Sequence, residues 1–189
     1  MNPPIDVSGT VLHTVRLTLR PWRVSDLNDL FAFTSQEGVG EMCGWQPHQD
    51  IHEAEVMLEG FMERKNSFAI EYRDHAVGIF SIPKYDEASF PQFSGMKGRE
   101  LYFVLSRDHW GQGFMQEATN EVIRFLFEDC GLDVIFCGHF VINQRSARLQ
   151  QKLGFHFCGY TEYRTKLGTL EKNQVNCMTR TEWEQRRYL

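Results

Sequence analysis

Residues 107–118 read Arg-Asp-His-Trp-Gly-Gln-Gly-Phe-Met-Gln-Glu-Ala and place two glycines between an apolar segment and an amphipathic one. The preceding residues 100–105 have the composition of a strand, and residues 114–130 carry apolar side chains at helical spacing. Glycines allow a tight turn with open N–H groups, and the first turn of a helix offers unpaired donors and a positive dipole end. Strand, glycine turn and helix in this order predict an anion-binding loop.

Two common nucleotide loops do not fit this stretch. A Walker loop needs a Lys and a hydroxyl residue directly after its last glycine, and neither follows Gly113. A dinucleotide-binding loop needs a third glycine three residues further on, where this chain has Gln116. The pattern that remains is Asp108-x-x-Gly111-x-Gly113.

This pattern resembles the pyrophosphate loop of the GNAT N-acetyltransferases, which bind acetyl-coenzyme A. Residues 110–118 are most similar to the RimJ/RimL branch of that superfamily, which includes acetyltransferases of protein N-termini. Many GNAT loops begin with Gln or Arg where this chain has Asp108, and the neighbouring Arg107 is then expected to serve the phosphates. The resemblance implies an enzyme that uses acetyl-CoA, and we expect it to use no metal.

A second motif spans residues 143–155, which read Asn-Gln-Arg-Ser-Ala-Arg-Leu-Gln-Gln-Lys-Leu-Gly-Phe. It resembles the Asn-x-x-Ser segment with a trailing Lys-Leu-Gly-Phe that ends the cofactor-binding half of these enzymes, although Gln151 stands where relatives often carry Glu. Taken alone, Asn143 and Gly154 could simply begin and end a helix, with Ser146 tolerated in its first turn. The combination with the glycine loop favours coenzyme A.

The resemblance implies an α/β (α+β) fold, the GNAT fold, with a mixed twisted central β-sheet, helices on both faces and a β-α-β acetyl-CoA-binding core. Residues 133–140 supply the second parallel strand. The two strands are expected to diverge, so that the pantetheine arm inserts between them and bonds to the backbone around Val104 and Leu105. The residues expected to hold acetyl-CoA are Val104, Leu105, Arg107, Trp110, Gly111, Gln112, Gly113, Phe114, Met115, Asn143, Ser146 and Arg148.

The length and pattern of the rest of the sequence predict one domain over residues 11–189, preceded by a flexible arm over residues 1–10. Pro83, Pro91 and two glycines make residues 83–98 irregular, either a plain loop or a wall of the acceptor pocket. The other predicted elements are a strand over 11–19, helices over 26–33 (capped by Ser25) and 51–64, a hairpin of 67–72 and 76–82, and a final antiparallel pair over 155–164 and 174–181, with Trp183 anchoring the terminus.

Composition narrows the class of partner. The net charge of −5 comes without a basic patch, which argues against nucleic acid and is compatible with an amine acceptor. Five cysteines without a Cys-x-x-Cys pair, and no signal peptide, indicate reduced thiols in the cytoplasm and no membrane association. His48 and His52 lack the companions of a metal motif. We expect a monomer or homodimer.

Acetyl transfer needs an uncharged amine, donors for the oxyanion and an acid for the leaving thiolate. Glu100 is the predicted base, although it could equally be a surface carboxylate at a strand end. Ser146 matches the family position whose hydroxyl can protonate the thiolate, and the backbone N–H groups near Val104 and Leu105 would stabilise the oxyanion. Alternative acids are Tyr102 and Tyr160.

The acceptor pocket is assigned to the exposed-looking Phe90 and Phe93, together with Tyr102. The leading hypothesis is direct transfer in a ternary complex to the α-amine of a protein N-terminus, such as that of a ribosomal protein. Small amines, including polyamines and antibiotics, are the alternative acceptors. Two other classes stay open: an acyl-CoA sensor without turnover, and an interaction domain that binds no coenzyme A.

Overall fold

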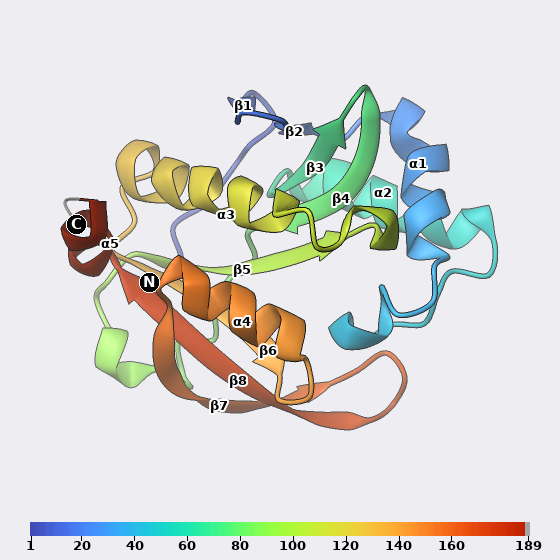
Figure 1. Cartoon of the computed structure of the whole chain (residues 1–189). Coiled ribbons are helices and arrows are strands. Elements are labelled where there is room, and N and C mark those ends of the chain that lie inside the picture. The colour runs from blue at the N-terminus through green and yellow to red at the C-terminus, as the bar shows by residue number, and fades with distance from the viewer. Residues whose placement is uncertain (188–189) are drawn as a thin grey trace.

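The computed structural model describes residues 1–187, within which eight strands form one sheet in the order β1-β2-β3-β4-β5-β6-β8-β7 (Figure 1). The strands are β1 (Leu12–His13), β2 (Thr18–Pro21), β3 (Ser67–Tyr72), β4 (His75–Ser81), β5 (Gly98–Leu105), β6 (Val134–Phe140), β7 (His156–Arg164) and β8 (Leu170–Thr179). The helices are α1 (Leu27–Thr34), α2 (Ile51–Arg64), α3 (Phe114–Arg124), α4 (Gln144–Leu153) and α5 (Arg180–Arg187).

Strands β5 and β6 are parallel, as the β-α-β prediction requires, and all other pairs in the described chain are antiparallel. Their pairing runs from Gly98 opposite Val134 to Leu101 opposite Cys137. Beyond that point β5 pairs only with β4, and β6 pairs only with β8. The sheet therefore splits between the carboxyl-terminal halves of β5 and β6, which confirms the predicted divergence.

Helices cover both faces of this sheet, which confirms the predicted fold class. Because strand side chains alternate between faces, Phe68 and Ile70 of β3 pack in one core, whereas Ala69 packs in the other. The first core holds buried residues of α3, with Leu149 and Leu153 of α4, and the second holds residues of α1 and α2. Figure 1 shows α3 and α4 on the same face of the sheet.

Local signals explain the helices that border the split. Helix α3 begins at Phe114 directly after Gly113, and its buried positions recur at helical spacing; the chain then continues through a π-helical turn over Phe125–Asp129. Helix α4 begins after Asn143, whose side chain accepts the Ser146 N–H, and ends at the left-handed Gly154. Both predicted helices are confirmed.

The predicted strand over 11–19 is wrong, because the chain turns back within it. The Thr14 N–H donates to the Leu17 carbonyl, and the Leu17 N–H returns to Thr14 Oγ1, each at 2.9 Å. Val15 lies at the turn and is 96% exposed. An alternating pattern predicts extended backbone, but this turn rests on a threonine side chain that alternation does not register.

The other element predictions differ only in detail. The helix over 51–64 is confirmed as α2, and the hairpin is β3 with β4. Ser25 is not a cap, because a 3-10 turn over Val24–Asp26 leads into α1. The strand expected over 174–181 begins earlier, at Leu170, and gives way to α5, where Trp183 packs on Phe127 as expected.

The first ten residues contain no helix or strand, yet they lie against the domain. Val7 is 1% exposed, and its N–H donates to the Lys65 carbonyl at 2.7 Å. The Pro3 carbonyl accepts hydrogen bonds from the buried Arg99 guanidinium, with Nε at 2.8 Å. Flexibility of this arm stays a prediction, and these contacts weigh against it.

Within residues 1–187, no helix is long and apolar enough to cross a bilayer. The described cysteines are all free thiols, two of them buried, at Cys137 and Cys177. No group of three His, Cys, Asp or Glu side chains in this part of the chain is arranged to hold a metal ion.

Candidate active site

A cleft of about 570 Å³ opens where β5 and β6 part. One side is lined by the glycine loop and by α3 and α4. The other side is lined by Gly38, Val39, Met42, Cys43, Glu100, Tyr102 and Tyr163. Leu101 and Leu105 of β5 belong to the core under α3, whereas Tyr102 and Val104 belong to the core under α1 and α2. The cleft thus passes through the sheet and connects its two faces.

The glycine loop presents an open cradle at one end of this cleft. Gly111 and Gly113 have φ of +75° and +79°, a conformation that glycine adopts without the strain of a side chain. A Cβ at Gly111 would meet no atom within 4 Å. The N–H groups of Gly111, Gln112 and Gly113 donate to no other described residue, and no side chain caps α3. An anion can therefore occupy this loop.

Cations gather at the same end, on helix α4. Arg145, Arg148 and Lys152 line the cleft, and the Arg145 guanidinium lies 4.0 Å from the centre of the Trp110 ring. A planar guanidinium on an aromatic face is a stable arrangement that leaves its N–H edge available for phosphate. Of these three cations, only Arg148 was predicted from the sequence, although the spacing of all three along one helix indicates a shared face.

The loop is also held from outside by an ion pair that the sequence did not predict. Arg16 donates from Nε to Glu117 Oε2 at 2.7 Å and from a terminal nitrogen to the Gln112 carbonyl at 2.9 Å. This contact ties the β1–β2 turn to the first turn of α3, more than ninety residues away. It fixes the position of the cradle.

Ser146 lies in the first turn of α4 and lines the cleft. Its Oγ accepts a hydrogen bond from Gln150 Nε2 at 3.0 Å. A hydroxyl has one proton and can both accept and donate, so the Ser146 proton remains available. Asn143 uses its side-chain oxygen to accept the Ser146 N–H at 3.2 Å, and it also lines the cleft.

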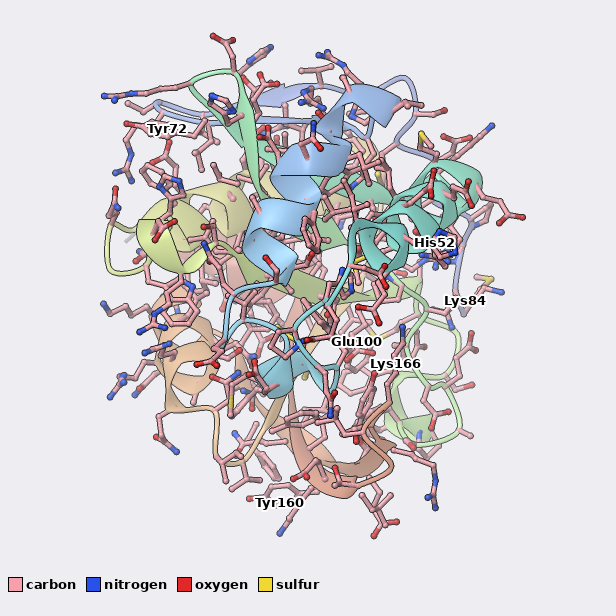
Figure 2. All side chains as sticks on the ribbon, turned by 90° about the vertical axis from the view of Figure 1, so that its right-hand side faces the viewer. His52, Tyr72, Lys84, Glu100, Tyr160 and Lys166 are labelled. Atoms are coloured by element: carbon pink, nitrogen blue, oxygen red, sulfur yellow. The ribbon has the colours of Figure 1, made fainter. Side chains whose placement is uncertain are left out.

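Glu100 occupies the other end of the cleft, near the centre of the view in Figure 2, on the face of the sheet opposite α3 and α4. The carboxyl is half-buried and accepts a hydrogen bond from the Gly138 N–H. Burial raises the pKa of Glu100 to about 7, and the negative charge of Asp86 adds to that rise while the Gly138 N–H opposes it. The group therefore changes charge near neutral pH.

Gly138 keeps space open beside this carboxyl. A Cβ at this position would lie 3.1 Å from Glu100 Oε1 and 2.7 Å from Asn173 Nδ2. Asn173 is held by a hydrogen bond from its Nδ2 to Thr161 Oγ1 at 3.1 Å. A side chain at residue 138 would fill the space next to the Glu100 carboxyl.

Tyr102 lines the cleft, but its hydroxyl is already bonded to neighbouring side chains of the cleft wall. It accepts a hydrogen bond from Trp45 Nε1 at 2.9 Å and contacts the Cys43 thiol. Burial raises the pKa of Tyr102 well above its ordinary value and that of Cys43 to about 11, so both groups are neutral at pH 7. Among the described residues that line this end of the cleft, Glu100 is the one acid, and Tyr102 and Cys43 beside it are uncharged.

Backbone alternation identifies which β5 amides face the gap. The Ser106 N–H donates to the Val77 carbonyl of β4, so alternate residues of β5 bond to β4 and the ones between them face away. The Leu105 carbonyl indeed turns from β4 and accepts Trp110 Nε1 at 2.9 Å. The free donors are therefore the Phe103 and Leu105 N–H groups, whereas Val104 bonds to β4.

Most of the site residues expected from the sequence lie together in the cleft, but four do not. Arg107 and Gln112 are exposed and do not line it. Phe90 is 5% exposed, so its interpretation as an exposed residue is wrong; it stacks on Phe136 at 5.3 Å, and Phe93 packs edge-on against the same ring. The predicted residues that line the cleft are Glu100, Tyr102, Val104, Leu105, Trp110, Gly111, Gly113, Phe114, Met115, Asn143, Ser146 and Arg148.

Two of these misplacements have a plain cause. Phe90 and Phe93 lie in an irregular segment whose polar and glycine residues suggest exposure, yet three rings from this segment cover Phe136 on the sheet. Tyr160, the alternative acid, is 53% exposed on the edge strand β7 and lies away from Glu100 at the lower rim of Figure 2.

Known proteins share this architecture and sequence pattern. The family profile described as an acetyltransferase (GNAT) domain matches residues 16–156. YoaA, an uncharacterised N-acetyltransferase from Bacillus subtilis, is 29% identical over 150 residues, which cover 77% of this chain and 82% of YoaA.

Solved structures agree in fold. A GNAT-family acetyltransferase from Bacillus anthracis superposes with a TM-score of 0.77 at 17% identity, over 90% of this chain and 98% of that one. A spermidine N-acetyltransferase from Vibrio cholerae, in complex with CoA and spermine, gives 0.71 at 16% identity, over 89% and 98%. Because the family profile spans most of the sheet and the whole glycine loop, the chain belongs to the GNAT family of N-acetyltransferases.

Proposed function

We propose that this enzyme transfers the acetyl group of acetyl-CoA directly to a primary amine, and that the amine is the α-amine of a protein N-terminus. The observation that carries the proposal is the cleft through the sheet, which has an anion cradle at one end and a titrating carboxyl at the other. A donor and an acceptor can enter from opposite faces and meet in the gap, which favours direct transfer in a ternary complex.

The residues present fit coenzyme A at the cradle end. The free N–H groups of the loop from Gly111 to Gly113 and the first turn of α3 would bind the pyrophosphate, with Arg145, Arg148 and Lys152 supplying positive charge. The extended pantetheine arm carries amides that suit the unpaired edge of β5. Acetyl-CoA supplies the activated acyl group when it is bound.

Three groups of the chain then divide the chemistry. Glu100 accepts the proton of the attacking amine, directly or through water, and its pKa near 7 suits that task. The Phe103 and Leu105 N–H groups face the gap, where they can donate to the oxyanion. Ser146 gives its hydroxyl proton to the thiolate as the carbon–sulfur bond breaks. No step needs a covalent acyl-enzyme or a metal.

Charge at the acceptor end favours an acceptor with one amine. Among the described residues that line the cleft, Glu100 is the only acid, and its neighbours Cys43, Tyr102 and Tyr163 carry no charge at neutral pH. A polyamine brings several ammonium groups, each of which would need a partner when desolvated. The spermidine N-acetyltransferase from Vibrio cholerae shares the fold of this chain. Because of the charge at the acceptor end, this chain is proposed to act on a different acceptor.

A peptide N-terminus suits the same surface because it offers one amine beside an often apolar side chain. Val39 and Met42 extend the uncharged wall, and the similarity of residues 110–118 to the RimJ/RimL branch supports the same acceptor class. A small molecule with a single amine is the alternative, and it would use the same carboxyl.

A combined binding and turnover assay tests the function. Acetyl-CoA at about a hundredfold excess over its Kd should add roughly 2.7 kcal/mol of stability in thermal unfolding. Thiol release is then measured with peptides bearing a free α-amine, the same peptides blocked at the N-terminus, spermine and an aminoglycoside. We expect release with the free peptides alone. Stabilisation without release from any amine would identify an acyl-CoA sensor, and release with spermine would contradict the acceptor class.

The glycine cradle gives a prediction for binding. Gly111→Val should raise the Kd for acetyl-CoA by more than about tenfold, because a β-branched residue at φ of +75° is strained by roughly 1–3 kcal/mol and its Cβ enters the cradle. Gly95→Val is the matched control, since Gly95 has φ of +86°, open surroundings and a position outside the cleft. Isothermal titration should show a loss in the first variant only; equal affinity in both would refute the cradle.

A further inference from the structure

Behind Ser146 lies a row of buried amide side chains that the chemistry above does not use. Gln150 follows Ser146 by one turn of α4 and is 0% exposed, and Asn176 of β8 is 6% exposed. Asn176 donates from Nδ2 to Gln150 Oε1 at 2.7 Å, and Gln150 donates from Nε2 to Ser146 Oγ at 3.0 Å. Amides are costly to bury in a core unless every polar atom is paired, so this row is a specific arrangement.

The direction of the hydrogen bonds along this row is set by a backbone carbonyl beside Gln150. Gln174 Nε2 donates to Asn176 Oδ1 at 3.0 Å, so the Asn176 nitrogen must face Gln150. The Gly138 carbonyl, which can only accept, lies 3.4 Å from Gln150 Nε2. Each amide therefore donates to the next in the order Gln174, Asn176, Gln150, and the last donates to Ser146.

A histidine completes the pairing. His139 is 6% exposed, and its Nδ1 lies 3.3 Å from Gln150 Oε1. Burial lowers the pKa of His139, so the ring is neutral at pH 7 and can place its one proton on Nδ1, facing the oxygen. The oxygen of Gln150 then accepts two hydrogen bonds, and its nitrogen is held facing Ser146.

From this geometry we infer that Gln150 is a positioning residue for acetyl transfer. It occupies an acceptor site on Ser146 Oγ with a donated N–H, which turns the hydroxyl proton away from the helix and toward the cleft. The same N–H stabilises negative charge on Oγ as that proton leaves. The inference rests on the proposed role of Ser146 and assigns Gln150 no contact with either substrate.

The proton and electron balance of the step is simple. As the carbon–sulfur bond breaks, its electron pair stays on sulfur, and the sulfur takes the proton from Ser146 Oγ. The serine oxygen regains a proton from water in the cleft, and Glu100 returns the amine proton to solvent. The enzyme is unchanged, and the products are an amide and a free thiol.

The test is a double-mutant cycle on single-turnover rates. Gln150→Met, which keeps length and removes the donor, should slow transfer about tenfold with the Kd for acetyl-CoA changed less than twofold. Ser146→Ala should cost about a hundredfold or more. Adding Gln150→Met to Ser146→Ala should then cost nothing further, because the proton it directs is gone. Gln151→Met, an exposed neighbour on α4, is the control and should leave the rate unchanged.

A second variant adds a readout that loss of packing cannot produce. Gln150→Glu has nearly the same shape, but an ionised carboxylate only accepts, so the Ser146 hydroxyl would turn and donate to it. We expect a greater loss than with Gln150→Met at pH 8, with both rates taken relative to the wild type at the same pH. That relative loss should shrink as the pH falls and the buried carboxyl at residue 150 takes up a proton. This variant also replaces Gln150→Met in the comparison should the latter not fold.

The outcomes separate the two proposals. If Ser146→Ala alone keeps the wild-type rate, the proposed role of Ser146 fails. If Ser146→Ala is slow and Gln150→Met slows it further by the same tenfold factor, the role of Gln150 as a positioning residue is overturned while the function stands. If Gln150→Met weakens acetyl-CoA binding in proportion to rate, Gln150 is merely structural and the inference is likewise overturned.

Discussion

Glu100→Gln is expected to lower kcat by roughly a hundred- to a thousandfold, because it removes the base and keeps the shape of the side chain. The amide oxygen can still accept the Gly138 N–H, so the cleft should retain its geometry. The wild-type rate should rise with pH through about 7, the pKa of this carboxyl, and the slow variant should lose that rise. Stopped-flow single turnovers between pH 5.5 and 9 measure both effects.

The free energy of unfolding of the wild type should fall over the pH range in which its rate rises. Burial raises the Glu100 pKa from 4.5 to about 7, so between these values the folded state holds a proton that the unfolded chain has released. The stability that this proton gives is complete below pH 4.5 and is lost as the pH rises through 7, by at most roughly 3 kcal/mol. The amide introduced at residue 100 does not titrate, so Glu100→Gln does not lose this stability. Its free energy of unfolding should therefore rise relative to that of the wild type between pH 5 and pH 8.

Two further variants test whether Glu100 is the base. Asp86→Asn removes the neighbouring negative charge and should move the rise in rate toward lower pH, since that charge helps to raise the Glu100 pKa. Glu162→Gln changes an exposed glutamate of β7 and should alter neither rate nor pH profile. If Glu100→Gln retains the wild-type rate and its pH dependence, the base is another group.

The second large effect is expected on folding. Arg20 is 3% exposed and forms a paired contact with Asp26, with both terminal nitrogens 2.8 Å from the carboxylate oxygens, while its Nε donates to Glu71. Arg20→Met should lower the free energy of unfolding by about 3–5 kcal/mol, because it leaves the buried Asp26 carboxylate without its counter-charge, with only the Arg23 N–H still donating to it. For a domain of this size the melting temperature should fall by roughly 10 °C or more.

Chemical denaturation of Arg20→Met beside Arg164→Met checks this expectation. Arg164 is an exposed arginine of β7, so its replacement should change the unfolding free energy by less than about 0.5 kcal/mol. Arg20, Asp26 and Glu71 do not line the cleft. The folded fraction of Arg20→Met should therefore bind acetyl-CoA with wild-type affinity. A loss below about 1 kcal/mol would mean that the carboxylates find water or another partner.

The local parts of the site could be predicted from the sequence because each rests on neighbouring residues. The left-handed glycines of the loop, the helix after Gly113 and the caps Asn143 and Gly154 each follow from the conformational freedom or hydrogen bonding of a few residues. Family resemblance added the cofactor and two candidate groups, Glu100 and Ser146, and the structure brings both to one cleft.

What the sequence could not predict depends on contacts between distant segments. The burial of Phe90 against Phe136 and the contact of Arg16 with the loop each join residues more than forty positions apart. No sequence pattern predicts such a long-range contact, because periodicity indicates only which side of its element a residue faces and not which segment packs on that side.

The sequence by itself determined the order of elements, the glycine cradle and the GNAT resemblance, since these are written in local backbone preference and in motif spacing. Only the tertiary structure decided that the cleft crosses the sheet, that burial raises the pKa of Glu100 to about 7 and that Gln150 donates a hydrogen bond to Ser146 Oγ. The physical reason is that desolvation, charge and hydrogen-bond direction at one atom are set by everything packed around it, and those neighbours come from β5, β6, β8 and α4 together.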